Sequence, residues 1–134
     1  MTMRTRSLAF LSMFAGAFLC AAPIFAHHGY AAYDMQITKT LKGTITEYMM
    51  ANPHSQIGVD VKDDSGNVEH WVVEDAATVR AMKEEGWEFD SLKPGDAVTI
   101  IYHPAKGPGH AGLLIRLEFP DGRTLPKPRA NNPG

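Results

Sequence analysis

Histidine is the residue type in this sequence best suited to chemistry. The 134-residue chain contains a single cysteine, and its six histidines are His27, His28, His54, His70, His103 and His110. Neutral imidazole is the commonest metal ligand in proteins, and it suits copper and zinc in particular. The first hypothesis for this chain is therefore a metal site built from histidines.

His27 and His28 gain a further ligand group if the chain is cut immediately before them. Cleavage after Ala26 would leave His27 with a free α-amine beside its imidazole, which makes a bidentate chelate. The amine has a reference pKa near 8, so a proton competes only mildly with a metal. One more imidazole would complete three nitrogens in a T-shaped arrangement, which favours copper first and zinc second. The alternative is that the histidine pair belongs to an unstructured leader.

Residues 1–26 have the three zones of a secretory signal peptide. Arg4 and Arg6 precede an apolar run from residue 8 to 19, and the segment ends at the small residue Ala26. The alternative is an uncleaved anchor helix. Phe18 and Leu19 stand where a lipoprotein signal requires small residues before Cys20. We therefore predict a periplasmic or secreted protein, cleaved near Ala26.

Cleavage would also change the composition of the protein. It removes the only cysteine and both Arg4 and Arg6, so the formal charge moves from −2 to −4. The mature chain can then form no disulfide and use no thiolate. Its acidic balance argues against nucleic-acid binding, which needs clustered basic residues. No later segment is long and apolar enough for a membrane span.

The remaining pattern predicts an all-β domain with one helix. Alternating apolar residues and turn-forming residues mark five strands, with Gly43 as a bulge or bend in the long first one. An acidic pair, Glu74-Asp75, and Gly86 at the C′ position bound the helix. The expected elements are strands near 36–49, 56–61, 68–74, 97–103 and 113–119, a helix at 76–85, and a flexible tail at 126–134.

The order β-β-β-α-β-β predicts an OB-like barrel over residues 27–125. The alternative is an open five-stranded sheet crossed by the helix. In such a barrel the first strand begins beside the end of the fourth, so the N-terminal histidines approach His103 and the loop carrying His110. His54, which follows the first loop, comes within reach. The predicted metal ligands are His27, His28, His54, His103 and His110.

His70 is treated separately because it lies inside the third predicted strand, next to Trp71. An ordinary strand histidine is the better interpretation there, and which of the two side chains faces inward stays open. Enzyme signatures are missing: the sequence has no nucleophile elbow, no HExxH motif and no phosphate loop. Glu47, Glu69 and Glu74 are not distinguished from ordinary surface carboxylates. We predict no catalysis.

Several short segments together resemble a family of small secreted bacterial proteins of unknown function. These segments are HHGYAAYD at 27–34, LKGT at 41–44, NPH at 52–54, VEHWVVE at 68–74, GW at 86–87 and LKPGD at 92–96. The resemblance spans roughly residues 27–125. It implies an exported single-domain β protein whose His-His lead-in belongs to the mature domain. It implies no activity, but it brings His54 and His70 forward as motif positions.

Three functions compete at this point. The first is a periplasmic metal-binding protein that uses its histidines for carriage or sequestration of copper. The second is a module that binds a small molecule, a glycan or a protein partner on the barrel face. Its stacking surfaces would be Tyr30, Tyr33, Tyr48, Trp71 and Tyr102. The third is a copper-dependent oxidoreductase, for which the sequence supplies no substrate cleft.

Overall fold

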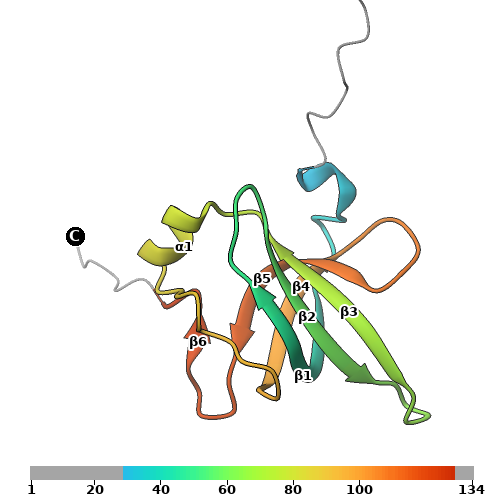
Figure 1. The fold of residues 1–134 in the computed structure, drawn as a ribbon. Helices are drawn as coiled ribbons and strands as arrows, with labels where there is room; N and C mark the ends of the chain where they lie inside the picture. The colour runs from blue at the N-terminus through green and yellow to red at the C-terminus, as the bar shows by residue number, and fades with distance from the viewer. Residues whose placement is uncertain (1–28, 129–134) are drawn as a thin grey trace, which may run out of the picture.

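The computed structural model of the chain describes residues 29–128 (Figure 1). The predicted signal peptide, His27, His28 and residues 129–134 of the predicted tail lie outside this range. The described part begins with a lead-in at residues 29–38, which contains the short 3₁₀ helix η1. The elements are η1 (Tyr30–Ala32), β1 (Lys39–Met49), β2 (Ser55–Lys62), β3 (Val68–Asp75), α1 (Val79–Glu84), β4 (Ala97–Pro104), β5 (Ala111–Glu118) and β6 (Thr124–Leu125).

The sheet closes into a barrel, which confirms the predicted fold and excludes the open sheet. Its strand order is β3-β2-β1-β4-β5-β6, and β3 also pairs in parallel with β5 from Val72↔Ala111 to Glu74↔Leu113. The single helix α1 lies between β3 and β4, as predicted (Figure 1). The two-residue strand β6 was not predicted, because a strand so short carries no readable periodicity.

The bulge in β1 lies at Thr46, and the prediction of a bulge at Gly43 is wrong. The pairing with β2 shifts between Ile45 and Glu47, while Gly43 pairs in regular register with Val98 of β4. The extra residue reverses the side-chain alternation. Tyr48 therefore turns toward the core, and Met49, expected on the side of Ile45, is 52% exposed.

Gly43 instead permits a close approach of two strands. A Cβ at this position would lie 2.5 Å from the Asp60 carbonyl oxygen and 2.7 Å from Cγ2 of Val59.

A second bulge occurs in β5 between Leu114 and Arg116, opposite Ile101–Tyr102 of β4. It puts Leu117 on the core side together with Leu114, opposite Ile100 and Tyr102. Ile115 stays outward on the side of Leu113, although the spacing predicts Leu113, Ile115 and Leu117 on one side.

The helix is shorter than the predicted 76–85 and starts from a different cap. The side chain of Thr78 accepts a hydrogen bond from the Ala81 N–H, so Thr78 is the N-cap. Asp75 still belongs to β3, and its carboxylate accepts from the Ala77 N–H in a local turn. Glu74 and Asp75 therefore do not cap α1. Gly86, with a φ of +91°, follows the helix as the predicted C′ glycine.

The core fills the barrel and the space under α1. Trp87, Ile45, Ile57, Ile100 and Leu117 are fully buried, and Met82 is the buried residue of α1. Burying side chains of this size stabilises the fold by about 1.5–3 kcal/mol each. At the chain's other end Leu125 is buried, and the Lys127 N–H donates to the Glu85 carbonyl. The beginning of the predicted tail is thus bonded to the helix end.

Candidate functional site

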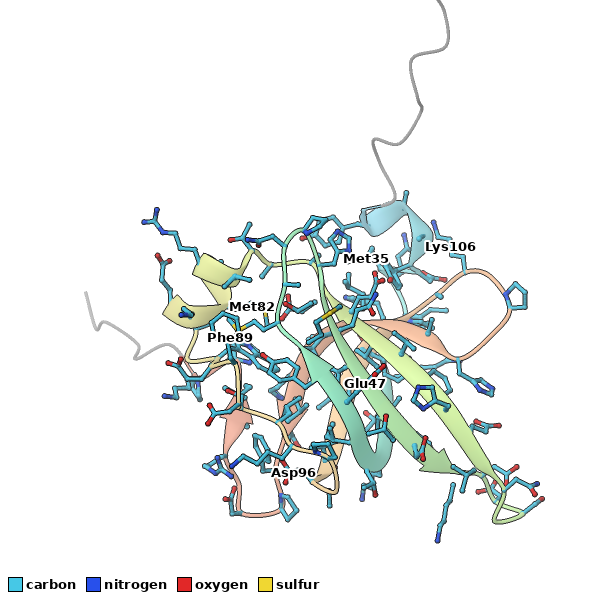
Figure 2. All side chains as sticks on the ribbon, viewed as in Figure 1. Met35, Glu47, Met82, Phe89, Asp96 and Lys106 are labelled. Carbon is cyan, nitrogen blue, oxygen red and sulfur yellow. The ribbon has the colours of Figure 1, made fainter. Side chains whose placement is uncertain are left out.

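The lead-in is attached to the barrel where β4 ends. Tyr33 forms a β-bridge with Ala105, the Asp34 N–H donates to the Pro104 carbonyl, and the Lys106 N–H donates to the Ala32 carbonyl. Figure 2 shows Met35 and Lys106 at this end of the molecule, far from Asp96 at the start of the fourth strand. The pairing of Lys39 with Tyr102 confirms that β1 begins beside the end of β4. The backbone that follows His28 therefore has a fixed position.

Three side chains meet at this attachment, and we call them the Glu74 cluster: Tyr33, His54 and Glu74. The Tyr33 hydroxyl donates to Oε2 of Glu74 at 2.7 Å, and Nδ1 of His54 lies 3.4 Å from the same oxygen. Burial, and then the hydrogen bond and negative charge of Glu74, raise the pKa of Tyr33 well above its ordinary value. Tyr33 therefore stays a neutral donor to the Glu74 carboxylate.

Histidine orientation follows a shared pattern in the described chain. Nδ1 faces an acceptor oxygen in three rings: Glu74 for His54, Asp60 at 2.9 Å for His70, and the Ile37 carbonyl at 2.7 Å for His103. A neutral imidazole that donates from Nδ1 carries its lone pair on Nε2. Metal-binding histidines are held in this way by a carboxylate or a carbonyl behind the ring. In that tautomer each of these three rings directs the lone pair of Nε2 away from its acceptor oxygen.

His110 has different surroundings. Its ring stacks on Trp71 with centroids 5.0 Å apart and an interplanar angle of 15°. Its Nε2 lies 3.6 Å from Oε2 of Glu69, which also accepts from Nε1 of Trp71 at 3.3 Å. Trp71 also contacts the ring of Tyr102 edge-on, with centroids 5.5 Å apart. His110 therefore covers an aromatic residue that packs against the core.

The three described histidines of the predicted site have different partners. Within residues 29–128 no group of three or more His, Cys, Asp or Glu side chains is placed to hold a metal ion. His54 joins the Glu74 cluster, His103 contacts Ile37, and His110 contacts Trp71. The predictions for His27 and His28 fall outside the described residues. Of the two neighbours His70 and Trp71, Trp71 packs against the core, whereas His70 faces outward with its side chain 51% exposed.

The aromatic side chains proposed as stacking surfaces are mostly internal. Tyr33 and Tyr102 are buried, and Tyr48 packs against the core and the ring of Trp87. Of the five proposed aromatic side chains, Tyr30 is the exposed one, at 60%. It lines a pocket of about 230 Å³ together with Asp75 and residues of β5. Burial raises the pKa of Asp75, although the Ala77 N–H and the charge of His54 both lower it.

Sequence reasoning missed the carboxylates that organise this region. From the sequence, Glu74 is expected to be an ordinary surface carboxylate and, together with Asp75, a helix cap. The available signal was the position of Glu74 at the end of the VEHWVVE segment.

A larger concavity of about 530 Å³ lies away from the histidines, lined by residues 90–97 and by the turn at 119–123. Among the described residues, no helix is long and apolar enough to cross a membrane.

Comparison with known proteins gives a family but no activity. The family model described as "Family of unknown function (DUF6152)" matches residues 17–114. No curated protein matches the chain. Because the match covers most of the sequence, the chain belongs to this family of unknown function.

Proposed function

We propose that this family member is an exported metal-binding protein that holds Cu²⁺ between its mature N-terminus and His54. The observation that carries the proposal is the shared oxygen of the Glu74 cluster. Oε2 of Glu74 accepts from the Tyr33 hydroxyl at 2.7 Å and lies 3.4 Å from Nδ1 of His54. One carboxylate therefore links a prepared imidazole to the segment that carries His27 and His28.

Chain geometry supports a meeting of these groups. The Ala32 N–H donates to the Gly29 carbonyl, so Gly29 lies within one turn of Ala32, the residue before Tyr33. A residue spans at most about 3.6 Å, so His27 begins no more than roughly 7 Å beyond Gly29. The α-amine and imidazole of His27 supply two nitrogens, and Nε2 of His54 supplies a third. His28 offers a further imidazole from the same segment.

Donor chemistry favours copper over zinc in this proposal. Three nitrogens in a T-shaped arrangement suit the tetragonal preference of Cu²⁺, whereas Zn²⁺ prefers a tetrahedral set. His54 is part-exposed, with 31% of its side chain accessible, so a metal ion can reach the ring from solvent. Glu74 would act behind His54 by fixing the ring and raising its basicity. His103 and His110 stay outside this site.

The direct test is a Cu²⁺ titration of matched chains, followed by calorimetry and electron paramagnetic resonance. The chains are the one beginning at His27, the same chain with Ala26 retained, and the His54→Gln variant. We expect each change to weaken binding by about tenfold or more, with loss of nitrogen hyperfine structure. His70→Gln is the matched control, because His70 is also held by a carboxylate but faces outward from β3. Equal affinities across all four chains would overturn the proposal.

Export is tested separately. N-terminal sequencing and metal analysis of protein purified from its native compartment should find His27 as the first residue, with bound copper. A chain that still begins at Met1, or that begins after another bond, would remove the α-amine from the site.

A further inference from the structure

The pocket lined by Tyr30 has a marked charge bias. Tyr30 comes from η1, Asp75 from the end of β3, and Leu113 and Ile115 from β5. The other lining residues include Glu85, and both charged side chains of the lining are acidic. The pocket, of about 230 Å³, is thus a recess with apolar walls that contains the part-buried carboxylate of Asp75. Its chemistry suits a small cationic group attached to an apolar or aromatic body.

Asp75 is held in place by the backbone beside the pocket. Burial raises its pKa even though its carboxylate accepts from the Ala77 N–H at 2.8 Å. Among residues 29–128 no lysine or arginine forms an ion pair with it. A part-buried carboxylate in this position gains strongly from an added positive charge, since the local dielectric constant is low.

We propose that the α-ammonium group created by cleavage after Ala26 docks in this pocket, against Asp75, in the metal-free protein. Tyr30 lines the pocket, and His27 precedes it by three residues, a span of at most about 11 Å. The mature N-terminus therefore reaches the pocket without rearrangement of the barrel. This inference rests on the cleavage site assumed in the proposed function, but not on copper.

Docking would also keep the N-terminus beside the copper ligand. Asp75 pairs with Ser55 across β2 and β3, and Ser55 directly follows His54. The amine would therefore rest next to His54 before a metal arrives. The uncleaved precursor has no amine at this position, so the arrangement forms only after maturation.

The first experiment follows the Asp75 carboxyl carbon by NMR as the pH is varied, with a chelator present. The sample is the chain from His27 to Gly134, which contains the complete barrel, and its partner is the same chain acetylated on the α-amine. We expect the Asp75 titration midpoint to be lower by about 1 pH unit or more with the free amine. The difference should shrink in 1 M salt, where the Debye length is about 3 Å. Identical titrations would overturn the inference.

The second experiment uses Asp75→Asn, which keeps the oxygen that accepts from Ala77. Because the folded chain raises the pKa of Asp75, the neutral form is favoured, so this substitution should raise Tm at pH 7 in the acetylated chain. With the free amine the gain should disappear or reverse, because the ammonium loses its partner. Asp64→Asn, in the exposed β2–β3 turn, is the control and should behave alike in both chains.

Equal gains in Tm from Asp75→Asn in the two chains would contradict docking.

The docking proposal and the copper proposal can fail separately. Copper can bind normally while the Asp75 titration is unaffected by acetylation, which rejects docking alone. Conversely, the titration can shift as expected in a chain that binds no Cu²⁺, which rejects the metal site alone. Docking of a solution cation instead would appear as an acetylation-independent titration that depends on that cation's concentration.

Discussion

Tyr33 and Glu74, 41 residues apart in the sequence, are joined by a 2.7 Å hydrogen bond that attaches the lead-in to the barrel. The bond links the first described turn of the chain to the end of β3. It also fixes the carboxylate that faces His54. The Tyr33 phenol therefore adds a side-chain link to the backbone bonds that position the N-terminal segment relative to His54.

Removing that phenol should weaken both the fold and the proposed metal site. We expect Tyr33→Phe to lower the free energy of unfolding by about 1.5–3 kcal/mol, because it removes a hydrogen bond to a charged, part-buried carboxylate. Urea denaturation measures the loss. Tyr30→Phe is the control, since Tyr30 is exposed, and it should change stability by less than about 0.5 kcal/mol. A tolerated Tyr33→Phe would mean that the backbone bonds alone hold the lead-in.

The substitution Glu74→Gln tests the negative charge of Glu74 separately from its role as a hydrogen-bond acceptor. The amide oxygen can still accept from Tyr33, but the negative charge behind His54 is lost. We expect the Cu²⁺ affinity of the mature chain to fall by about 10–100-fold, as for other residues behind a metal ligand. The matched substitution Glu69→Gln, beside His110, should leave that affinity unchanged.

Gly43 tests the close approach of β1 and β2. An alanine Cβ there would meet the carbonyl of Asp60 at 2.5 Å, and backbone cannot move aside as a flexible side chain can. We expect Gly43→Ala to cost about 1–3 kcal/mol in urea denaturation. Gly107→Ala is the matched control, because nothing lies within 4 Å of its Cβ position. Equal effects at both sites would mean that the strands adjust freely.

The stack of His110 on Trp71 has a fluorescence signature. His110→Ala should expose one face of the Trp71 indole, shift its emission to longer wavelength and increase quenching by acrylamide. Trp87, which is fully buried, should not respond. His70→Ala is the control, because His70 points away from Trp71 across the strand. Unchanged quenching in His110→Ala would show that other parts of the β4–β5 loop cover the indole.

Tyr48 gives the fold a dependence on alkaline pH. Burial, and then the charges of Asp75 and Glu88, raise its pKa to about 12 in the folded chain, against 10.0 ordinarily. The folded state thus holds the proton more tightly than the unfolded state. Its stabilising contribution is complete below pH 10 and is lost as the pH rises toward 12. Urea denaturation between pH 7 and 11.5 should show this loss.

Tyr48→Phe should flatten that alkaline decline. Among the described residues, the Tyr48 hydroxyl is buried and has no hydrogen-bond partner. Its removal at pH 7 should therefore be neutral or stabilising by up to about 1 kcal/mol. A destabilised Tyr48→Phe would indicate that the hydroxyl is hydrogen-bonded in solution.

Local patterns in the sequence determined the number, type and order of the main elements. Alternation of apolar residues marked five strands, and Gly66 and Gly86 marked a turn and a helix end that do have positive φ. Together these imply the barrel, because a β-β-β-α-β-β chain that buries one face of each strand closes most readily in that way. The pairing of β1 with the end of β4 followed from the same reasoning.

Only the tertiary structure decided which side chains meet. The bulge at Thr46 turned Tyr48 inward, and the bulge in β5 put Leu117 on the core side with Leu114, because one extra residue reverses every later side chain. Likewise, Tyr33, His54 and Glu74 come from three separate segments, and no spacing in the sequence brings them together. The histidines indicated the chemistry from their types alone. Which oxygen orients each imidazole depends on strand register, and register is set by packing across the whole barrel.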